Sequence, residues 1–309
     1  MAERPTLVYV AIAVGVVSFT FSPILVRWAD DAPGLAIAVW RTVLAALLLT
    51  PIAWKRVQPE VKALCGRDWI LIAASGVFLG LHFITWIESL YHTTVASASV
   101  LVTTSPIFLL AFGALFLDEQ LSRPTVGAIV AAVGGAALIG WGDAHGVVLG
   151  PNPLWGNGLA LTASLLVSLY LLIGRVVRQR VSWLAYIFPL YVVTACTTVA
   201  VALAQDVPLF TYSWTFYGLC LLMALGPQLL GHGSFNYALQ YVPAALVGMM
   251  ALLEPVGASA MAYVLFGETP TPLAVAGMLV VLMAVATVVW TERTGMRRAN
   301  GPADTVPEN

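Results

Sequence analysis

Two stretches of this chain decide its fold: LHFITWIESLYHTTVASASVLVTTSPIFLLAFGALFLDEQLSRPTV, residues 81–126, and LGHGSFNYALQYVPAALVGMMALLEPVGASAMAYVLFGETPTPLAV, residues 230–275. They align without a gap at a constant offset of 149 positions, and the match continues to residues 139 and 288. Leu81 and Leu230 match in this alignment, as do Pro106 and Pro255. Both copies are almost wholly apolar, and each is long enough for about three membrane crossings. The duplication therefore predicts a polytopic membrane protein built from two halves.

The amino-acid composition is typical of an integral membrane protein. Of the 309 residues, 60% are hydrophobic and 9% are charged, against roughly 25% charged in soluble domains. The few basic residues form no face for nucleic acid, and the net charge is -1. The 3 cysteines are widely spaced, which suggests neither a disulfide framework nor a metal cluster. No Gly-rich loop ending in Gly-Lys-Ser/Thr is present, so no nucleotide cofactor and no ATP-driven transport are expected.

Connectors containing Pro, Gly, Asp or Arg divide the chain into ten apolar runs. Each run is about 20 residues long, which matches a hydrocarbon core of roughly 30 Å. The predicted spans are residues 7–26, 33–54, 69–90, 95–117, 124–141, 155–177, 183–204, 214–239, 244–266 and 272–291. The first run is too long for the apolar part of a signal peptide, so we expect a retained helix.

The positive charge is distributed unevenly among the connectors, and this predicts the orientation. With the N-terminus inside, the cytoplasmic segments hold twelve of the 14 basic residues: Arg4, Lys55, Arg56, Lys62, Arg67, Arg123, Arg175, Arg178, Arg180, Arg293, Arg297 and Arg298. The opposite side holds only Arg27, and Arg41 lies within the second span. A missed span would swap the sides of every later connector. We therefore expect ten spans and cytoplasmic positions for both termini.

Each half contains five spans, an odd number, so the second copy enters the membrane from the opposite face. The predicted fold is all-α, with ten transmembrane helices in two inverted five-helix repeats, residues 1–142 and 143–292. Two such halves can rock about a site at the midplane, as in secondary transporters. Residues 293–309 lack an apolar run to bury and are expected to form a disordered cytoplasmic tail.

A carboxyl group stands in the middle of the ninth span, where charge is costly. Glu254 precedes Pro255, which lacks an N–H and leaves a nearby carbonyl without its helical partner. Burial favours the neutral form of a carboxyl, so Glu254 is a candidate for meeting a cation, an amine or a proton. The alternative is a protonated carboxyl that hydrogen-bonds to a neighbouring helix. The equivalent position in the first repeat is Ser105, so this charge belongs to one half.

Two further spans carry polar stripes. Gln228, His232 and Asn236 recur at every fourth position, which places them on one face of an α-helix. The third span has a similar stripe with Glu88 on a neighbouring face. The candidates for substrate or proton coupling are Glu254, His82, His232 and Glu88. The candidates for the substrate cavity are Trp86, Gln228, Asn236, Ser105, Ser18, Phe19, Tyr170 and Tyr237. The alternative for these polar groups is helix-to-helix packing and hydrogen bonding.

Other conspicuous residues have structural interpretations. Arg41 is expected to snorkel to the membrane interface. Glu119 and Glu268 are expected to cap a helix or to pair with a basic connector. The fifth span is rich in glycines, which permit close packing either within the chain or at a dimer seam. His232 and Ser234 lie two apart on a helix and point in different directions, so no hydrolase and no other enzyme is expected.

The chain resembles the EamA-type transporters of the drug/metabolite transporter superfamily over roughly residues 7–291. The resemblance rests on a helix-loop-helix pattern that occurs twice. The first half reads Ser89-Leu90-Tyr91, Ala96-Ser97-Ala98-Ser99, Pro106, Glu119 and Gly127. The second half reads Ala238-Leu239-Gln240-Tyr241, Pro243-Ala244-Ala245, Glu254-Pro255-Val256, Gly267-Glu268 and Gly277. The resemblance implies a bacterial inner-membrane protein with a central cavity lined mainly by spans one, three, four, six, eight and nine.

The resemblance also implies a secondary transporter of a small organic metabolite, amino acid-like or another small solute, working by export. Aromatic residues near the expected cavity favour a zwitterionic or aromatic metabolite. A proton is one candidate coupling ion, and facilitated diffusion or exchange is the other option. A non-transporting membrane sensor or scaffold is the alternative of a different class. The substrate's identity and the oligomeric state stay open, with a monomer as one option.

Overall fold

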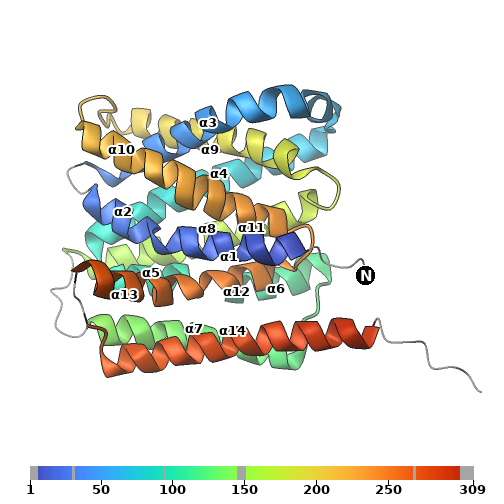
Figure 1. Ribbon diagram of the computed structural model, residues 1–309. Coiled ribbons are helices and arrows are strands. Elements are labelled where there is room, and N and C mark those ends of the chain that lie inside the picture. Colours follow the sequence, from blue (N-terminus) through green and yellow to red (C-terminus); the bar gives the residue numbers. More distant parts are fainter. Residues whose placement is uncertain (1–5, 30–31, 94, 145–150, 267–268, 300–309) are drawn as a thin grey trace, which may run out of the picture.

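The computed structural model describes residues 6–29, 32–93, 95–144, 151–266 and 269–299, and the regular elements within them are all helices (Figure 1). Nine helical segments of this part of the chain are long and apolar enough to cross a membrane, and a shorter apolar helix covers Arg123–Ile139. The fold is therefore the predicted all-α membrane protein with ten spans.

The spans of the first half are five. They are α1 (Thr6–Thr20) with α2 (Ser22–Trp28), then α3 (Gly34–Ala63), α4 (Gly66–His92), α5 (Val95–Val102) with α6 (Ser105–Leu117), and α7 (Arg123–Ala144). The second half has the same order, with a π-helix, η1, inside its third span. Its elements are α8 (Pro153–Val177), α9 (Trp183–Ala204), α10 (Trp214–Met223) with η1 (Ala224–His232) and α11 (Gly233–Ala238), α12 (Ala244–Ala251) with α13 (Leu253–Phe266), and α14 (Pro272–Ala299).

The packing of the helices follows a two-fold relation between the two halves, in which equivalent spans either pack on each other or make reciprocal contacts. Three pairs join equivalent spans: α3 packs against α9, α6 against α12, and α7 against α14. The remaining close pairs are reciprocal, because α4 packs against α8 while its counterpart η1 packs against α1. In Figure 1 the α7–α14 pair forms one outer layer, with α1, α8 and α12 between it and the layer of α3, α9 and α10. The two halves are thus two inverted repeats wrapped around a common centre.

Prolines determine where spans are interrupted. Pro106 and Pro255 occupy equivalent positions, and span four breaks between α5 and α6 just as span nine breaks between α12 and α13. Each proline lacks the N–H that would bond to the carbonyl four residues earlier. Pro23 follows the break between α1 and α2. Pro227 lies inside the π-helix, whereas α4, the counterpart of that span, is continuous. Interrupted spans therefore occur in both halves.

Side chains at one edge of the bundle tie the two halves together. Arg175 Nε lies 2.8 Å from Glu119 Oε1, and Arg180 Nε lies 2.7 Å from Asp68 Oδ1. Ser182 Oγ donates to Glu60 at 2.6 Å. These connectors are the ones that the charge pattern placed on one side, and the expected pairing of Glu119 with a basic connector is confirmed. In Figure 1, α1 begins and α14 ends at the same edge.

The opposite edge has ties of its own. Trp40 Nε1 donates to the Leu209 carbonyl at 2.7 Å, and Thr93 Oγ1 donates to Asn157 Oδ1 at 2.9 Å. Both bonds join the first half to the second. The bundle is therefore bridged above and below its centre.

Two predictions are refined by the packing of α7 and α14. Of the fifth-span glycines, Gly135 serves a contact within the chain: a Cβ on Gly277 would lie 2.5 Å from the Gly135 carbonyl oxygen, whereas a Cβ on Gly127 or Gly134 would meet no atom within 4 Å. Helix α14 extends to Ala299, so residues 293–299 of the predicted disordered tail are helical. Good helix formers such as Glu and Arg continue the helix past the end of the apolar run. Residues 300–309 and Glu268 lie outside the described residues.

Candidate functional site

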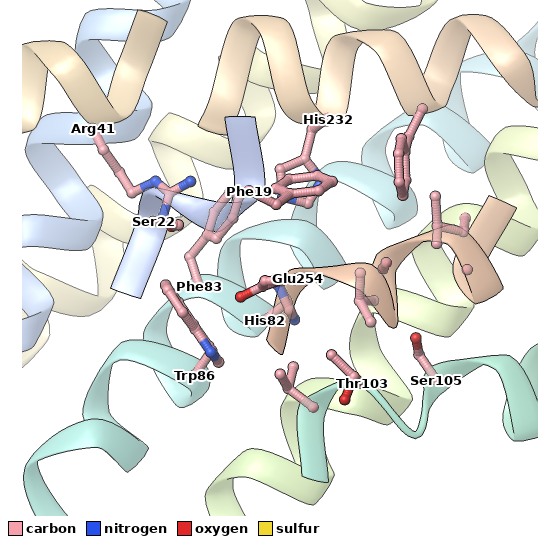
Figure 2. Close-up of a pocket in the computed structure, with 16 residues that line it drawn as sticks. Phe19, Ser22, Arg41, His82, Phe83, Trp86, Thr103, Ser105, His232 and Glu254 are labelled. Atoms are coloured by element: carbon pink, nitrogen blue, oxygen red, sulfur yellow. The ribbon is translucent and has the colours of Figure 1, made fainter. Parts of the chain in front are cut away.

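The interrupted helices surround a cavity of about 70 Å³ at the junction of the repeats (Figure 2). Spans one, three, four, six, eight and nine all contribute to it, and span two joins them. Its lining residues are Phe19, Ser22, Arg41, His82, Phe83, Trp86, Val102, Thr103, Ser105, Val167, Leu171, His232, Phe235, Gly248, Ala251 and Glu254. Since one water needs about 10–15 Å³, the space holds roughly five.

Breaks in the helices place polar groups in this apolar space. Ser22 follows the α1–α2 break, Thr103 lies at the α5–α6 break, and Glu254 lies in the first turn of α13. Backbone that leaves the helical path is tolerated at membrane depth where it borders a cavity. In each of these three spans, a proline follows the polar residue within three positions and accounts for the break in the helix.

A fully buried arginine enters the cavity from α3. Arg41 is 1% exposed, and its Cζ lies 4.1 Å from the centroid of the Phe83 ring. Its Nε and Nη1 atoms have no hydrogen-bond partner in the described part of the chain. The prediction that Arg41 snorkels to the interface is wrong. The preceding Trp40 is bonded to Leu209, so the connector after α9 covers the start of α3 and Arg41 turns inward.

Glu254 is the carboxyl group of the cavity. Figure 2 shows Glu254 and Arg41 reaching into the same space from α13 and α3. The two side chains line the same cavity, yet they form no ion pair with each other in the described part of the chain. The site therefore holds one guanidinium and one carboxyl group that share a cavity without pairing.

Hydrogen bonds from outside the cavity fix the orientation of His232. Asn236 Nδ2 donates to the His232 carbonyl at 2.8 Å and to Tyr170 Oη at 2.9 Å. Because Tyr170 Oη accepts there, its own hydrogen is available to His232 Nδ1, 3.2 Å away. In a neutral ring that accepts this hydrogen at Nδ1, the N–H is on Nε2. With that tautomer, His232 offers a donor at Nε2.

His82 has the opposite arrangement. Its Nδ1 lies 2.8 Å from the Ala163 carbonyl oxygen, which can only accept, so Nδ1 carries the hydrogen. The neutral ring of His82 then has its acceptor at Nε2. The two imidazole centroids are 6.1 Å apart. Together the histidines give the cavity wall one donor and one acceptor beside the charged pair.

The structure brings together half of the residues singled out from the sequence. The cavity wall contains Glu254, His82, His232, Trp86, Ser105 and Phe19. Tyr170 and Asn236 lie behind the wall as supports of His232. The other four candidates are placed away from the lining: Gln228, Glu88, Ser18 and Tyr237.

Each of these four has a different setting. Glu88 pairs with His92 at 3.1 Å near the end of α4. Ser18 donates to the Val14 carbonyl of its own helix at 2.7 Å, and the ring of Tyr237 packs on Tyr241 and Trp183. The side-chain amide of Gln228 is buried, and neither of its polar atoms has a partner in the described residues.

Sequence reasoning missed Arg41 as part of the site. Its signal was available, because a basic residue within an apolar span is rare and marks a functional site by default. Phe83, which supports the guanidinium, follows His82 directly, but nothing in an apolar span distinguishes one phenylalanine from another.

Comparison with known proteins agrees with this architecture. The model of the EamA-like transporter family matches residues 6–141 and 154–290. The pseudopaline exporter CntI of Pseudomonas aeruginosa is 24% identical over 276 residues, covering 86% of this chain and 91% of the relative. A probable terminal-alkyne amino-acid exporter of Streptantibioticus cattleyicolor is 26% identical over 270 residues, covering 82% and 86%.

A solved crystal structure of a protein 13% identical in sequence has the same fold, with a TM-score of 0.78 over 94% of this chain and 99% of that chain. The family match covers both repeats and nearly all of the helices that enclose the cavity. This chain therefore belongs to the EamA-like transporter family.

Proposed function

We infer that this chain exports a small organic metabolite across a bacterial inner membrane by alternating access. The halves, residues 1–142 and 143–292, are the moving units, and both termini face the cytoplasm. The observation that carries this proposal is the cavity itself, which is lined by interrupted helices of both repeats and by an arginine and a carboxyl side chain. The names of the two exporters to which the chain is similar support the direction of transport.

Glu254 is the group that couples transport to protons in this proposal. No hydrogen-bond or ion-pair partner of its carboxyl occurs among the described residues, so its charge depends on what enters the cavity. The ionisable groups that face it are Arg41 from α3, His82 from α4 and His232 from η1. A proton and a cationic group of the substrate then compete for one carboxyl. Such competition exchanges an inward proton for an outward substrate.

Uptake into liposomes tests both parts of this proposal. The purified protein is reconstituted, and a pool of labelled amino acids, nucleosides and small amines is offered with and without an imposed pH gradient. Saturable uptake that the gradient accelerates is expected. Glu254→Gln should transport more slowly and lose the response to the gradient, because an amide neither pairs with a cationic group nor exchanges a proton near neutral pH.

Glu88→Gln is the matched control. Glu88 is also a carboxyl on a spanning helix, but it pairs with His92 outside the cavity, so this variant should keep the wild-type response. A Glu254→Gln protein with unchanged rate and pH dependence would sink the coupling role. Uptake indifferent to the gradient in the wild type would instead indicate a facilitator or exchanger.

A non-transporting sensor or scaffold is distinguished by accessibility. Single cysteines at Ser105 and His232, in a chain whose three native cysteines are replaced, are labelled from each side of the membrane. Alternating access predicts that both positions react from either side and that substrate shifts the balance. A sensor or scaffold predicts reaction from one side at most.

A further inference from the structure

Arg41 stands out among the cavity residues because two of its hydrogen-bond donor atoms have no acceptor in the described part of the protein. Its guanidinium is 1% exposed, and both Nε and Nη1 are buried without a hydrogen-bond partner in the described residues. The Phe83 ring, 4.1 Å from Cζ, contacts one face of the guanidinium. A ring face attracts the charge but does not accept the N–H bonds in the guanidinium plane. The donors of Arg41 are therefore left for another acceptor.

Two other arginines, Arg178 fully buried and Arg175 partly buried, show how this chain satisfies guanidinium groups. Arg178 is also 1% exposed, and it donates to the Asn236 and Val181 carbonyls and to Gln240 Oε1. Arg175 pairs with Glu119 and donates to the Leu239 carbonyl. Both lie at the edge of the bundle and hold connectors in place. Arg41 differs from both, because no hydrogen bond from its side chain to a connector occurs among the described residues and it lines the cavity.

We propose that Arg41 binds the carboxylate of the transported substrate, and that Glu254 binds its amino group, so that the substrate class is the α-amino acid zwitterion and its relatives. A planar guanidinium matches a carboxylate through two parallel N–H···O bonds. When Glu254 is ionised, its charge balances that of Arg41, and a ligand without net charge leaves that balance undisturbed. This inference rests on the proposed function, because it assigns the ligand of the same cavity.

The histidines complete the recognition. With Tyr170 donating to its Nδ1, His232 presents a donor at Nε2, and the bond to the Ala163 carbonyl leaves His82 an acceptor at Nε2. Both belong to the cavity wall that also includes Arg41 and Glu254 (Figure 2). One supports the carboxylate end of a zwitterion and the other its ammonium end. Phe19, Phe83 and Trp86 supply the apolar wall for a side chain.

The experiment compares ligands that differ in one charged group. Binding of labelled free amino acids to the purified protein is measured first, and the tightest is then competed with three derivatives. These are its α-amide, its decarboxylated amine and its N-acetyl form. Ligand-induced shifts of the thermal unfolding midpoint give a second binding readout that does not depend on transport. The wild-type protein should prefer the free amino acid over each derivative by roughly 10-fold or more.

Arg41→Gln tests the carboxylate site directly. This variant should bind the free acid and the α-amide within about threefold of each other, because the group that distinguishes them is gone. Arg180→Gln is the control, since it removes a positive charge whose partner is Asp68 at the edge of the bundle. It should keep the wild-type preference. A variant that merely loosens the fold weakens all ligands alike.

Arg41→Lys is a second variant that decides the matter if Arg41→Gln does not fold. Lysine keeps the charge and loses the fork, so binding of the free acid should weaken while binding of the α-amide stays unchanged. Equal weakening of acid and amide overturns the proposal. An Arg41→Gln protein that still prefers the acid as strongly as the wild type also overturns it.

The outcomes for the two proposals are distinguishable. Uptake of amines or nucleosides with no preference for a carboxylate leaves export standing and overturns the role of Arg41. Binding of amino acids that depends on Arg41, with no transport in liposomes, supports the role of Arg41 and contradicts the proposed export. If no compound of the panel binds the wild-type protein, the amino acid assignment is overturned.

Discussion

Tyr170 positions His232 from behind the cavity wall. Its hydroxyl accepts from Asn236 Nδ2 at 2.9 Å and lies 3.2 Å from His232 Nδ1. Tyr170→Phe removes both bonds and leaves the buried His232 Nδ1 without a partner, whereas Asn236 Nδ2 keeps its bond to the His232 carbonyl. A loss of about 1–3 kcal/mol in the free energy of unfolding is expected. Because His232 also loses the bond that sets its tautomer, transport should fall by roughly tenfold, which corresponds to one hydrogen bond of about 1.4 kcal/mol.

Tyr186→Phe separates the two effects. Tyr186 is as buried as Tyr170, with 0% exposure for both, and its hydroxyl bonds to Ser75 Oγ at 2.7 Å away from the lining. This variant should lose similar stability and keep wild-type transport per folded molecule. Thermal unfolding in detergent and uptake into liposomes give the two readings. Equal transport losses in both variants would contradict a special role for Tyr170.

Individual site residues differed in how far the sequence predicted them. Glu254 was found because a carboxyl before a proline in an apolar span is rarely kept for packing alone. Arg41 was misplaced because the length of its side chain permits snorkelling, and the covering contact between Trp40 and Leu209 spans 169 positions. A local sequence pattern does not reveal contacts between residues so far apart in the chain. The inward position of Arg41 could not be predicted for that reason.

At the scale of elements, the paired breaks in spans four and nine are the feature with a clear test. Pro106→Ala with Pro255→Ala restores both missing N–H groups and should make each span a continuous helix. Thr103 and Glu254 then turn away from the cavity, so transport should drop by roughly tenfold or more while the unfolding temperature stays level or rises. Cysteine accessibility at Ser105 should drop with it. Full transport in the double variant would show that the breaks are dispensable.

Pro51→Ala is the control for this prediction. Pro51 lies inside α3, which continues through it from Gly34 to Ala63, and it is not part of the cavity lining. Removing it should leave transport unchanged. A loss of transport in this control would mean that any proline replacement in a spanning helix disturbs the fold.

The eighth span was predicted correctly as a membrane-spanning helix, but the prediction of which of its side chains face the cavity was only partly correct. The spacing of Gln228, His232 and Asn236 placed them on one side of an α-helix. Residues Ala224–His232 form a π-helix instead, whose hydrogen bonds run from i to i+5 and change the rotation per residue. His232 consequently reaches the cavity while Gln228 and Asn236 do not. Pro227 was the local signal, but a proline predicts an interruption without specifying its kind.

At the scale of the whole molecule, the sequence was sufficient for the architecture. Ten spans, two inverted repeats and the grouping of connectors at two edges follow from hydropathy, duplication and positive charge, all of which are properties summed over many residues. The shape of the cavity depends instead on how seven spans pack, which is a property of pairs far apart in the chain. The sequence therefore predicted the spans that surround the cavity more accurately than it predicted the side chains that face into it.

The ties at the two edges make a final prediction about the balance between open states. Alternating access requires that the contacts at one edge separate while those at the other hold. Glu119→Gln removes the charge that pairs with Arg175 at 2.8 Å and should favour opening at that edge. The Trp40 ring packs on Tyr217 with centroids 4.9 Å apart. Trp40→Phe keeps an aromatic ring there but removes the N–H bonded to Leu209. It should favour opening at the opposite edge.

Each variant serves as the control for the other. The Arg175–Glu119 pair is partly exposed, with 19% and 18% of the side-chain surfaces accessible, so its contribution is of order 0.2–1 kcal/mol. The population of each open state should then shift by roughly 1.5-fold to fivefold, in opposite directions for the two variants. Labelling rates of a cysteine at Ser105, measured in right-side-out and inside-out vesicles, report these populations. Shifts of the same sign in both variants would contradict a rocking mechanism, because a rigid rocking motion cannot open both edges at once.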